Sequence, residues 1–197
     1  MTMMEERQTV LRGELALLLA VVTNSFGVVL MLRSGSGISA ISSVPYAFSE
    51  LFPRVSMGTW TYIFQGLLVL SLMVLRKRFV PEYLFSFVVG FIFSELLDVH
   101  KMWIDILPTD LGWCVLYFVV SYFLLCIGIA LSNRCKLPII PTDLFPRELS
   151  EIINVSYSKV KIIFDVTCLA VTAGMTLIFL GRLDGLGIGT VLAAFTM

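Results

Sequence analysis

Ser25-Phe26-Gly27-Val28-Val29-Leu30, in the first half of the chain, matches Cys126-Ile127-Gly128-Ile129-Ala130-Leu131 in the second half at an offset of 101 residues. The same offset pairs identical residues further along: Arg33 with Arg134, Ile38 with Ile139, Pro45 with Pro146, and Glu50 with Glu151. Both halves are apolar enough to be bundles of membrane helices. Two copies of an odd number of membrane helices lie in opposite orientations, an architecture found in many secondary transporters.

The composition predicts a membrane protein. Of the 197 residues, 58% are hydrophobic and 14% are charged, and the mean hydropathy is +0.94. Soluble domains carry about 25% charged residues, and a chain this short cannot enclose so much apolar surface in water. We therefore expect the lipid bilayer as its partner. The basic and acidic residues cancel, so no net field favours nucleic acid.

Five apolar runs approach the length of about 20 residues that a membrane-spanning helix needs. They cover residues 15–32, 57–75, 80–97, 113–131 and 160–180. A further run from Gly185 reaches only Met197, so we expect the chain to be truncated within its last helix. The predicted fold class is all-α, a polytopic membrane helix bundle that forms a single integral membrane domain, 1–197. Its two inverted three-helix repeats are repeat A at 13–100 and repeat B at 113–197.

Each repeat also contains a short segment that is broken by proline. Residues 38–52 contain Pro45, and residues 137–153 contain prolines at 138, 141 and 146. Both segments are too short and too polar to span, so they are re-entrant or lie along the interface. A broken segment frees backbone polar groups, which lipid tolerates only where they line a cavity or are buried in protein. The matching positions support a shared cavity, and the alternative is that both segments merely join helices.

Basic residues divide unequally between the two sides of the predicted membrane. Ten lie on the side of the N-terminus and four lie on the other side, and basic loops stay cytoplasmic. We therefore expect a multi-pass inner-membrane protein with a cytoplasmic N-terminus and an external acidic loop at 98–110. The first apolar run is too long for a signal peptide and lacks a small-residue cleavage site, so it is expected to remain as an anchor.

The broken segments supply the candidate solute site. Ser42 in the first segment, with Thr142 and Asp143 in the second, offers hydroxyl and carboxylate oxygens near the expected midplane. Asp143 has a structural alternative, because an aspartate at the start of a short helix can cap its first N–H groups.

Two amides and two glutamates in or near the predicted spans each have more than one interpretation. Asn24 and Gln65 are amides near the middle of their spans, where they hydrogen-bond between helices or contact the substrate. Two glutamates related by the repeat could form ion pairs at helical spacing: Glu50 with Arg54, and Glu151 with Arg147.

Asp165 is the most informative single residue, because it lies inside the fifth predicted span. A carboxylate at the centre of a membrane helix costs about 2.5–3.5 kcal/mol on insertion scales, so it needs a partner, a water path or a proton. Lys161, one turn earlier, could pair with it near the cytoplasmic interface by extending toward the headgroups. The functional alternative is a carboxylate that couples transport to protons or cations.

The sequence contains no Walker-type glycine loop, no Ser/His/Asp set and no paired Cys or His ligands. We therefore expect no catalytic residues, no metal site, no cofactor and no enzyme activity. The four cysteines lack the spacing of a disulfide framework and are interpreted as small apolar side chains. The single histidine, His100, is expected at a solvated helix end.

Three short motifs resemble the YczE/YitT-like family of bacterial integral membrane proteins. They are the Leu186–Ala194 stretch, the Pro141-Thr142-Asp143 turn and Asp165. Ser39-Ala40-Ile41-Ser42 departs from the family pattern, in which a proline and an acidic residue often occupy these places. The resemblance implies a bacterial membrane location and this fold more than it implies a substrate.

Two functional hypotheses follow from these features. The first is a secondary transporter or permease for a small solute, in which Asp143 contacts the solute and Asp165 couples protons. The second is a membrane scaffold or regulatory protein that stabilises partner proteins, and it predicts a packed bundle without a polar cavity. The chain could also associate as a homodimer.

Overall fold

The computed structural model describes residues 3–135, 139–187 and 189–192, and these residues are helical without any strand. The helices are α1 (Met3–Arg33), α2 (Ala40–Leu51), α3 (Met57–Arg76), α4 (Pro81–Ile104), α5 (Leu111–Arg134), α6 (Pro141–Ile153) and α7 (Tyr157–Leu180). Residues 189–192 begin a further helical turn. The expected length of this last helix lies outside the described residues.

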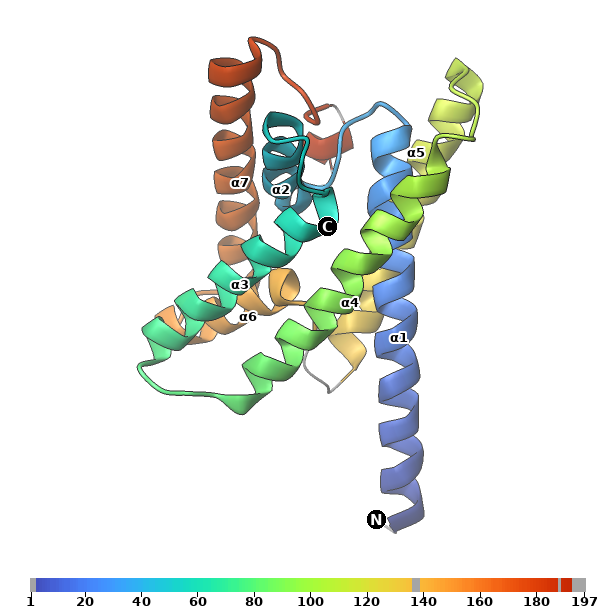
Figure 1. Ribbon diagram of the computed structural model, residues 1–197. Coiled ribbons are helices and arrows are strands. Elements are labelled where there is room, and N and C mark those ends of the chain that lie inside the picture. The colour runs from blue at the N-terminus through green and yellow to red at the C-terminus, as the bar shows by residue number, and fades with distance from the viewer. Residues whose placement is uncertain (1–2, 136–138, 188, 193–197) are drawn as a thin grey trace.

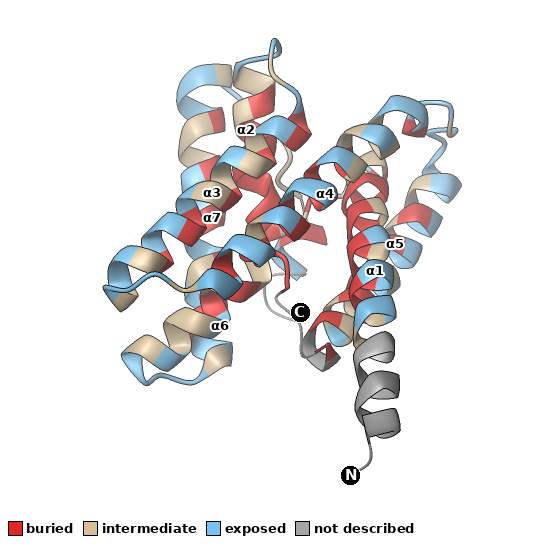
Figure 2. Cartoon of the chain, turned by 60° about the horizontal axis from the view of Figure 1, so that its bottom comes forward, coloured by how far each residue is buried: buried red, intermediate tan, exposed pale blue. Residues whose placement is uncertain are grey.

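The five predicted spans are confirmed as long apolar helices. They are Gly13–Arg33, Met57–Arg76, Pro81–Ile104, Leu111–Ser132 and Tyr157–Leu180. Large apolar side chains such as Leu70, Phe91 and Ile163 are exposed. Figure 2 shows exposed positions, in pale blue, along the long helices. Because water disfavours so much exposed apolar surface, these faces suit lipid tails. The chain is a multi-pass membrane protein.

The third span is longer than predicted. The sequence placed its end at residue 97 and an external loop at 98–110, but α4 continues to Ile104. Asp98 lies inside the helix, and its Oδ1 accepts a hydrogen bond from the backbone N–H of Gly58 at 2.8 Å. This contact to the start of α3 satisfies the carboxylate without ending the helix. Only residues 105–110 connect α4 to α5.

Both broken segments form short helices. α2 has Pro45 in its interior, and α6 has Pro141 at its start and Pro146 in its interior. Most residues of α2 are buried, so α2 does not lie along the membrane surface. Each short helix packs against the third helix of both halves, since α2 contacts α7 and α3, and α6 contacts α3 and α7.

α1 and α5 cross in contact and run in opposite directions (Figure 1). Gly128 of α5 lies against the side chain of Asn24, and Gly27 of α1 lies against Leu125. The 101-residue offset pairs Gly27 with Gly128 and Asn24 with Leu125. The two glycine contacts are therefore equivalent under the repeat. The absence of a Cβ at these two positions lets the backbones approach closely, as small residues do between membrane helices.

We expect Gly128→Ala to destabilise the fold, because a Cβ at Gly128 would collide with the Asn24 amide. The matched control is Gly174→Ala in α7, where a Cβ meets nothing within 4 Å and the gain in helix propensity is the same. Overpacking typically costs about 1–3 kcal/mol relative to such a control. Thermal unfolding in detergent measures the difference, and equal midpoints for both variants would contradict the close α1–α5 contact.

Candidate functional site

A cavity of about 70 Å³ lies where the first turns of α2 and α6 meet α1, α4, α5 and α7. One water molecule needs roughly 15 Å³ on this measure, so the cavity has room for several waters or one small solute. Five of the six predicted site residues line it: Asn24, Ser42, Thr142, Asp143 and Asp165. Residues from both halves of the chain thus contribute to one site.

The two short helices point their N-terminal ends into this cavity. α2 begins after Ser39 and α6 begins after Ile140, and neither helix has a side-chain cap on its first N–H groups. The predicted capping role of Asp143 is therefore wrong, because this residue lies in the first turn of α6 and makes no cap bond. A carboxylate in the first turn is still stabilised by the positive end of the helix dipole.

Asp165 and Lys161 form an ion pair inside the protein. The Nζ atom of Lys161 donates to Oδ2 of Asp165 at 3.1 Å, and the two side chains are only 10% and 3% exposed. The lysine therefore turns inward and does not extend toward the headgroups. Oδ1 of Asp165 is buried without a hydrogen-bond partner, so half of this carboxylate is an unsatisfied acceptor.

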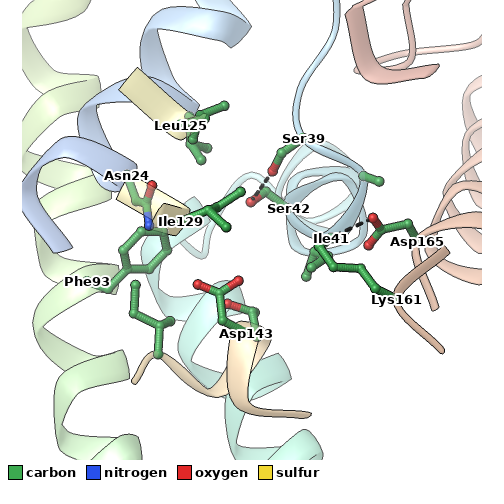
Figure 3. Close-up of a pocket in the computed structure, with 14 residues that line it drawn as sticks. Asn24, Ser39, Ile41, Ser42, Phe93, Leu125, Ile129, Asp143, Lys161 and Asp165 are labelled. Carbon is green, nitrogen blue, oxygen red and sulfur yellow. Dashed lines mark hydrogen bonds and ion pairs between the residues drawn. The ribbon is translucent and has the colours of Figure 1, made fainter. Parts of the chain in front are cut away.

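Asp143 occupies the middle of the site. Figure 3 shows its carboxylate between the Asn24 side of the cavity and the Lys161–Asp165 side. Its side chain has no hydrogen bond or ion pair among the described residues, although it lines the same cavity as Lys161. The site thus brings together two carboxylates and one ammonium group.

The two amides do not make the hydrogen bonds that were predicted between helices. Oδ1 of Asn24 is buried without a partner beside Gly128, and both polar atoms of the Gln65 side chain are buried without partners. Gln65 does not line the cavity, because its Oε1 atom lies against Gly90 and Pro141 just behind the start of α6. It is the one predicted site residue that the structure places outside the cavity.

Two lining residues with polar side chains, Ser39 and Lys161, were not among the predicted site residues. Ser39 donates its hydroxyl to Oγ of Ser42 at 2.8 Å, and Lys161 lines the cavity beside Asp165. The three-residue spacing of the serines and the four-residue spacing of the ion pair are the signals in the sequence that place each pair on one helix face.

A polar contact joins the two halves on the face nearer the α1 N-terminus. The Tyr83 hydroxyl donates to the Glu148 carboxylate, which also pairs with Arg76 at 2.6 Å. Arg76 reaches Glu151 at 3.3 Å. Neither of the two predicted ion pairs, Glu151 with Arg147 and Glu50 with Arg54, occurs among the described residues. Glu151 pairs instead with Arg76 of the other repeat.

A related contact lies on the opposite face. The Tyr46 hydroxyl donates to Oδ1 of Asp184 at 3.3 Å, and Asp184 pairs with Arg182 at 2.8 Å. Burial, together with the carboxylates of Glu50 and Asp184, raises the pKa of the Tyr46 phenol, so it remains a donor. Tyr83 and Asp184 are equivalent under the 101-residue offset, whereas Tyr46 corresponds to Arg147, the neighbour of Glu148, so the two contacts are only approximately related by the repeat.

Residues 11–197 match the model of a protein family described as a family of unknown function, DUF6198. The chain belongs to this family. No curated protein and no solved structure matches the chain. Membership of DUF6198 thus agrees with a multi-pass membrane protein and assigns no substrate.

We expect Lys161→Met to destabilise the protein by about 3–5 kcal/mol at pH 8, because it leaves the Asp165 carboxylate buried without its counter-charge. The double variant Lys161→Met/Asp165→Leu should recover most of this loss. Lys159→Met, at an exposed position two residues earlier, is the matched control. Denaturant titration in detergent measures the free energies of unfolding. An equal loss in the control would contradict the buried pair.

Proposed function

We propose that the chain is a secondary transporter of the bacterial inner membrane that moves a small polar solute in exchange with, or together with, protons. The observation that carries this proposal is the cavity between the N-terminal ends of α2 and α6. Ser42, Thr142 and Asp143 contact the solute there, and Asp165 takes up the coupled proton. Broken helices that meet at a polar site near the midplane are typical of transporter folds.

The internal duplication supports alternating access. α1 and α5 run in opposite directions, and α2 and α6 lead away from the cavity toward different faces, as expected for inverted repeats at 13–100 and 113–197 (Figure 1). Two inverted copies can exchange conformations, which opens the same site to one face and then to the other. The excess of basic residues places the N-terminus in the cytoplasm, so the Tyr83–Glu148 contact closes the cytoplasmic side.

The cavity favours transport over the scaffold hypothesis, which predicts a bundle without a polar interior. The cavity holds two carboxylates, an ammonium group and hydroxyls within a lipid-facing bundle. Charged groups at such depth are costly and typically mark pathways for ions or solutes. The resemblance to YczE/YitT-like proteins is in keeping with a bacterial membrane location and adds no constraint on the solute.

Liposomes with a trapped pH dye test the proposal. Small polar solutes are added one at a time under an imposed pH gradient, and protein-free vesicles give the background. We expect at least one solute to dissipate the gradient through the wild-type protein. Failure of every solute would count against transport.

Asp165→Asn should abolish the proton movement in the same assay, because an amide cannot take up the coupled proton. Asp110→Asn, at an exposed position outside the cavity, is the control and should behave as wild type. Proton movement that persists in Asp165→Asn would remove this residue from coupling.

Restraining either polar contact between the halves should stop transport. The two variants are Tyr83→Cys/Glu148→Cys and Tyr46→Cys/Asp184→Cys, each in a background without the four native cysteines. A bifunctional thiol reagent should inhibit both variants, and a monofunctional reagent should not. Full transport by either cross-linked variant would show that this contact does not open during the cycle.

A further inference from the structure

The cavity holds more negative than positive charge. Asp143 and Asp165 each contribute a carboxylate, and Lys161 is the only other charged residue in the described lining. Lys161 is bonded to Asp165 at 3.1 Å, while Asp143 has no described hydrogen bond or ion pair. One carboxylate therefore faces the cavity without a bonded counter-charge inside a lipid-facing bundle, where an isolated charge is costly, and Lys161 acts on it only at longer range.

The remaining lining atoms suit a small cation. Ser42 and Thr142 add hydroxyl oxygens to the carboxylate of Asp143, and Oδ1 of Asp165 is buried without a partner. Hard cations prefer such oxygen ligands. No group of three His, Cys, Asp or Glu side chains that could hold a metal ion occurs within the described ranges, and divalent ions usually need several carboxylates. A single positive charge is what the site lacks.

The N-terminal ends of α2 and α6 carry partial positive charge, which offsets part of the negative charge of the cavity. Each N-terminus carries the equivalent of about half a positive charge, and the end of α6 acts first on Asp143 in its own first turn. Burial raises the pKa of Asp143, and the helix end and Lys161 act against this shift while the site is empty. A cation in contact with this carboxylate meets a full negative charge at shorter range than either helix end.

We infer that the transported solute is a small monovalent cation that binds at Asp143 and is exchanged for a proton taken up by Asp165. This inference rests on the proposed function, since it names the solute class for the same cavity.

The exchange balances in charge through Lys161. With the cation on Asp143, Lys161 remains on the ionised Asp165, and the site is neutral. When Asp165 takes up a proton, Lys161 loses its partner and turns to Asp143, where its ammonium group displaces the cation. Loss of the proton returns Lys161 to Asp165. One positive charge enters for each one that leaves, so the exchange is electroneutral.

Few other titratable groups face Asp165 in the described structure. α7 contributes Lys161, Cys168 and Tyr157, and α6 contributes Asp143. The turn of α2 that lines the cavity presents only the hydroxyls of Ser39 and Ser42 as polar side chains. The competition between proton and cation therefore involves the two carboxylates and Lys161.

Liposomes with a trapped pH dye test the exchange, with NaCl, KCl or LiCl added outside and choline chloride as the control at equal ionic strength. We expect at least one alkali ion to raise the internal pH at least tenfold faster than in protein-free vesicles. A neutral or anionic solute that moves protons while no alkali ion does would overturn the cation inference and leave the proposed transport intact. Inactivity with every class of solute would count against both.

A binding measurement separates Asp143 from a purely structural role. At pH 8 the alkali ion should raise the unfolding midpoint of the detergent-purified protein above that in choline, and Asp143→Asn should lose this rise. Asp110→Asn, outside the cavity, should keep it. A rise that persists in Asp143→Asn overturns the site.

The pH dependence of binding tests the role of Asp165. The apparent affinity of the wild type for the cation should fall at least tenfold between pH 8 and pH 6, because the proton competes. Asp165→Asn should bind the cation weakly at both pH values, because a neutral side chain at this position leaves Lys161 on Asp143. If Asp143→Asn does not fold, the wild type at the two pH values decides, and an affinity that is independent of pH overturns the exchange.

Discussion

The antiparallel crossing of α1 and α5 is the constraint on which the other elements depend. Gly27 and Gly128 remove two side chains from this crossing, so the helices touch near the centre of the bundle. Because the two helices run in opposite directions, the segments that follow them start from opposite faces. α2 and α6 then reach the same central cavity from different sides. A wider crossing would separate the two short helices and divide the cavity between them.

The charged side chains in the cavity are stabilised by opposite charges and by a helix dipole. Charges are expensive in a lipid-facing bundle, and the structure accommodates three of them within one cavity. Lys161 neutralises Asp165 directly, whereas Asp143 depends on the more diffuse field of a helix end. Because Asp143 has no bonded partner among the described residues, it can still bind a ligand. A carboxylate that is fully paired within the protein could not.

The sequence predicts the regular parts of this structure and misses contacts between distant residues. Apolar runs and the 101-residue offset are local signals, so the five spans and the two short helices could be anticipated. The same holds for Asp165 with Lys161, which are neighbours on one helix face. The extension of α4 past Asp98 depends on a hydrogen bond from another helix, at Gly58. The contacts of Tyr83 and Tyr46 likewise join residues far apart in the chain, and their partners follow from packing alone.

The two polar contacts at opposite faces are unequal in strength. Arg76 and Glu148 have side chains that are 21% and 16% exposed, whereas Arg182, which supports the other contact, is 71% exposed. Exposed ion pairs contribute little because water competes for them, but Arg182 and Asp184 lie in the same loop of one half. On this face the halves are also joined by backbone hydrogen bonds from Ile38 to Gly185 and from Gly189 to Ser36. In the proposed transport cycle, opening toward this face has to break backbone hydrogen bonds as well as the Tyr46–Asp184 contact.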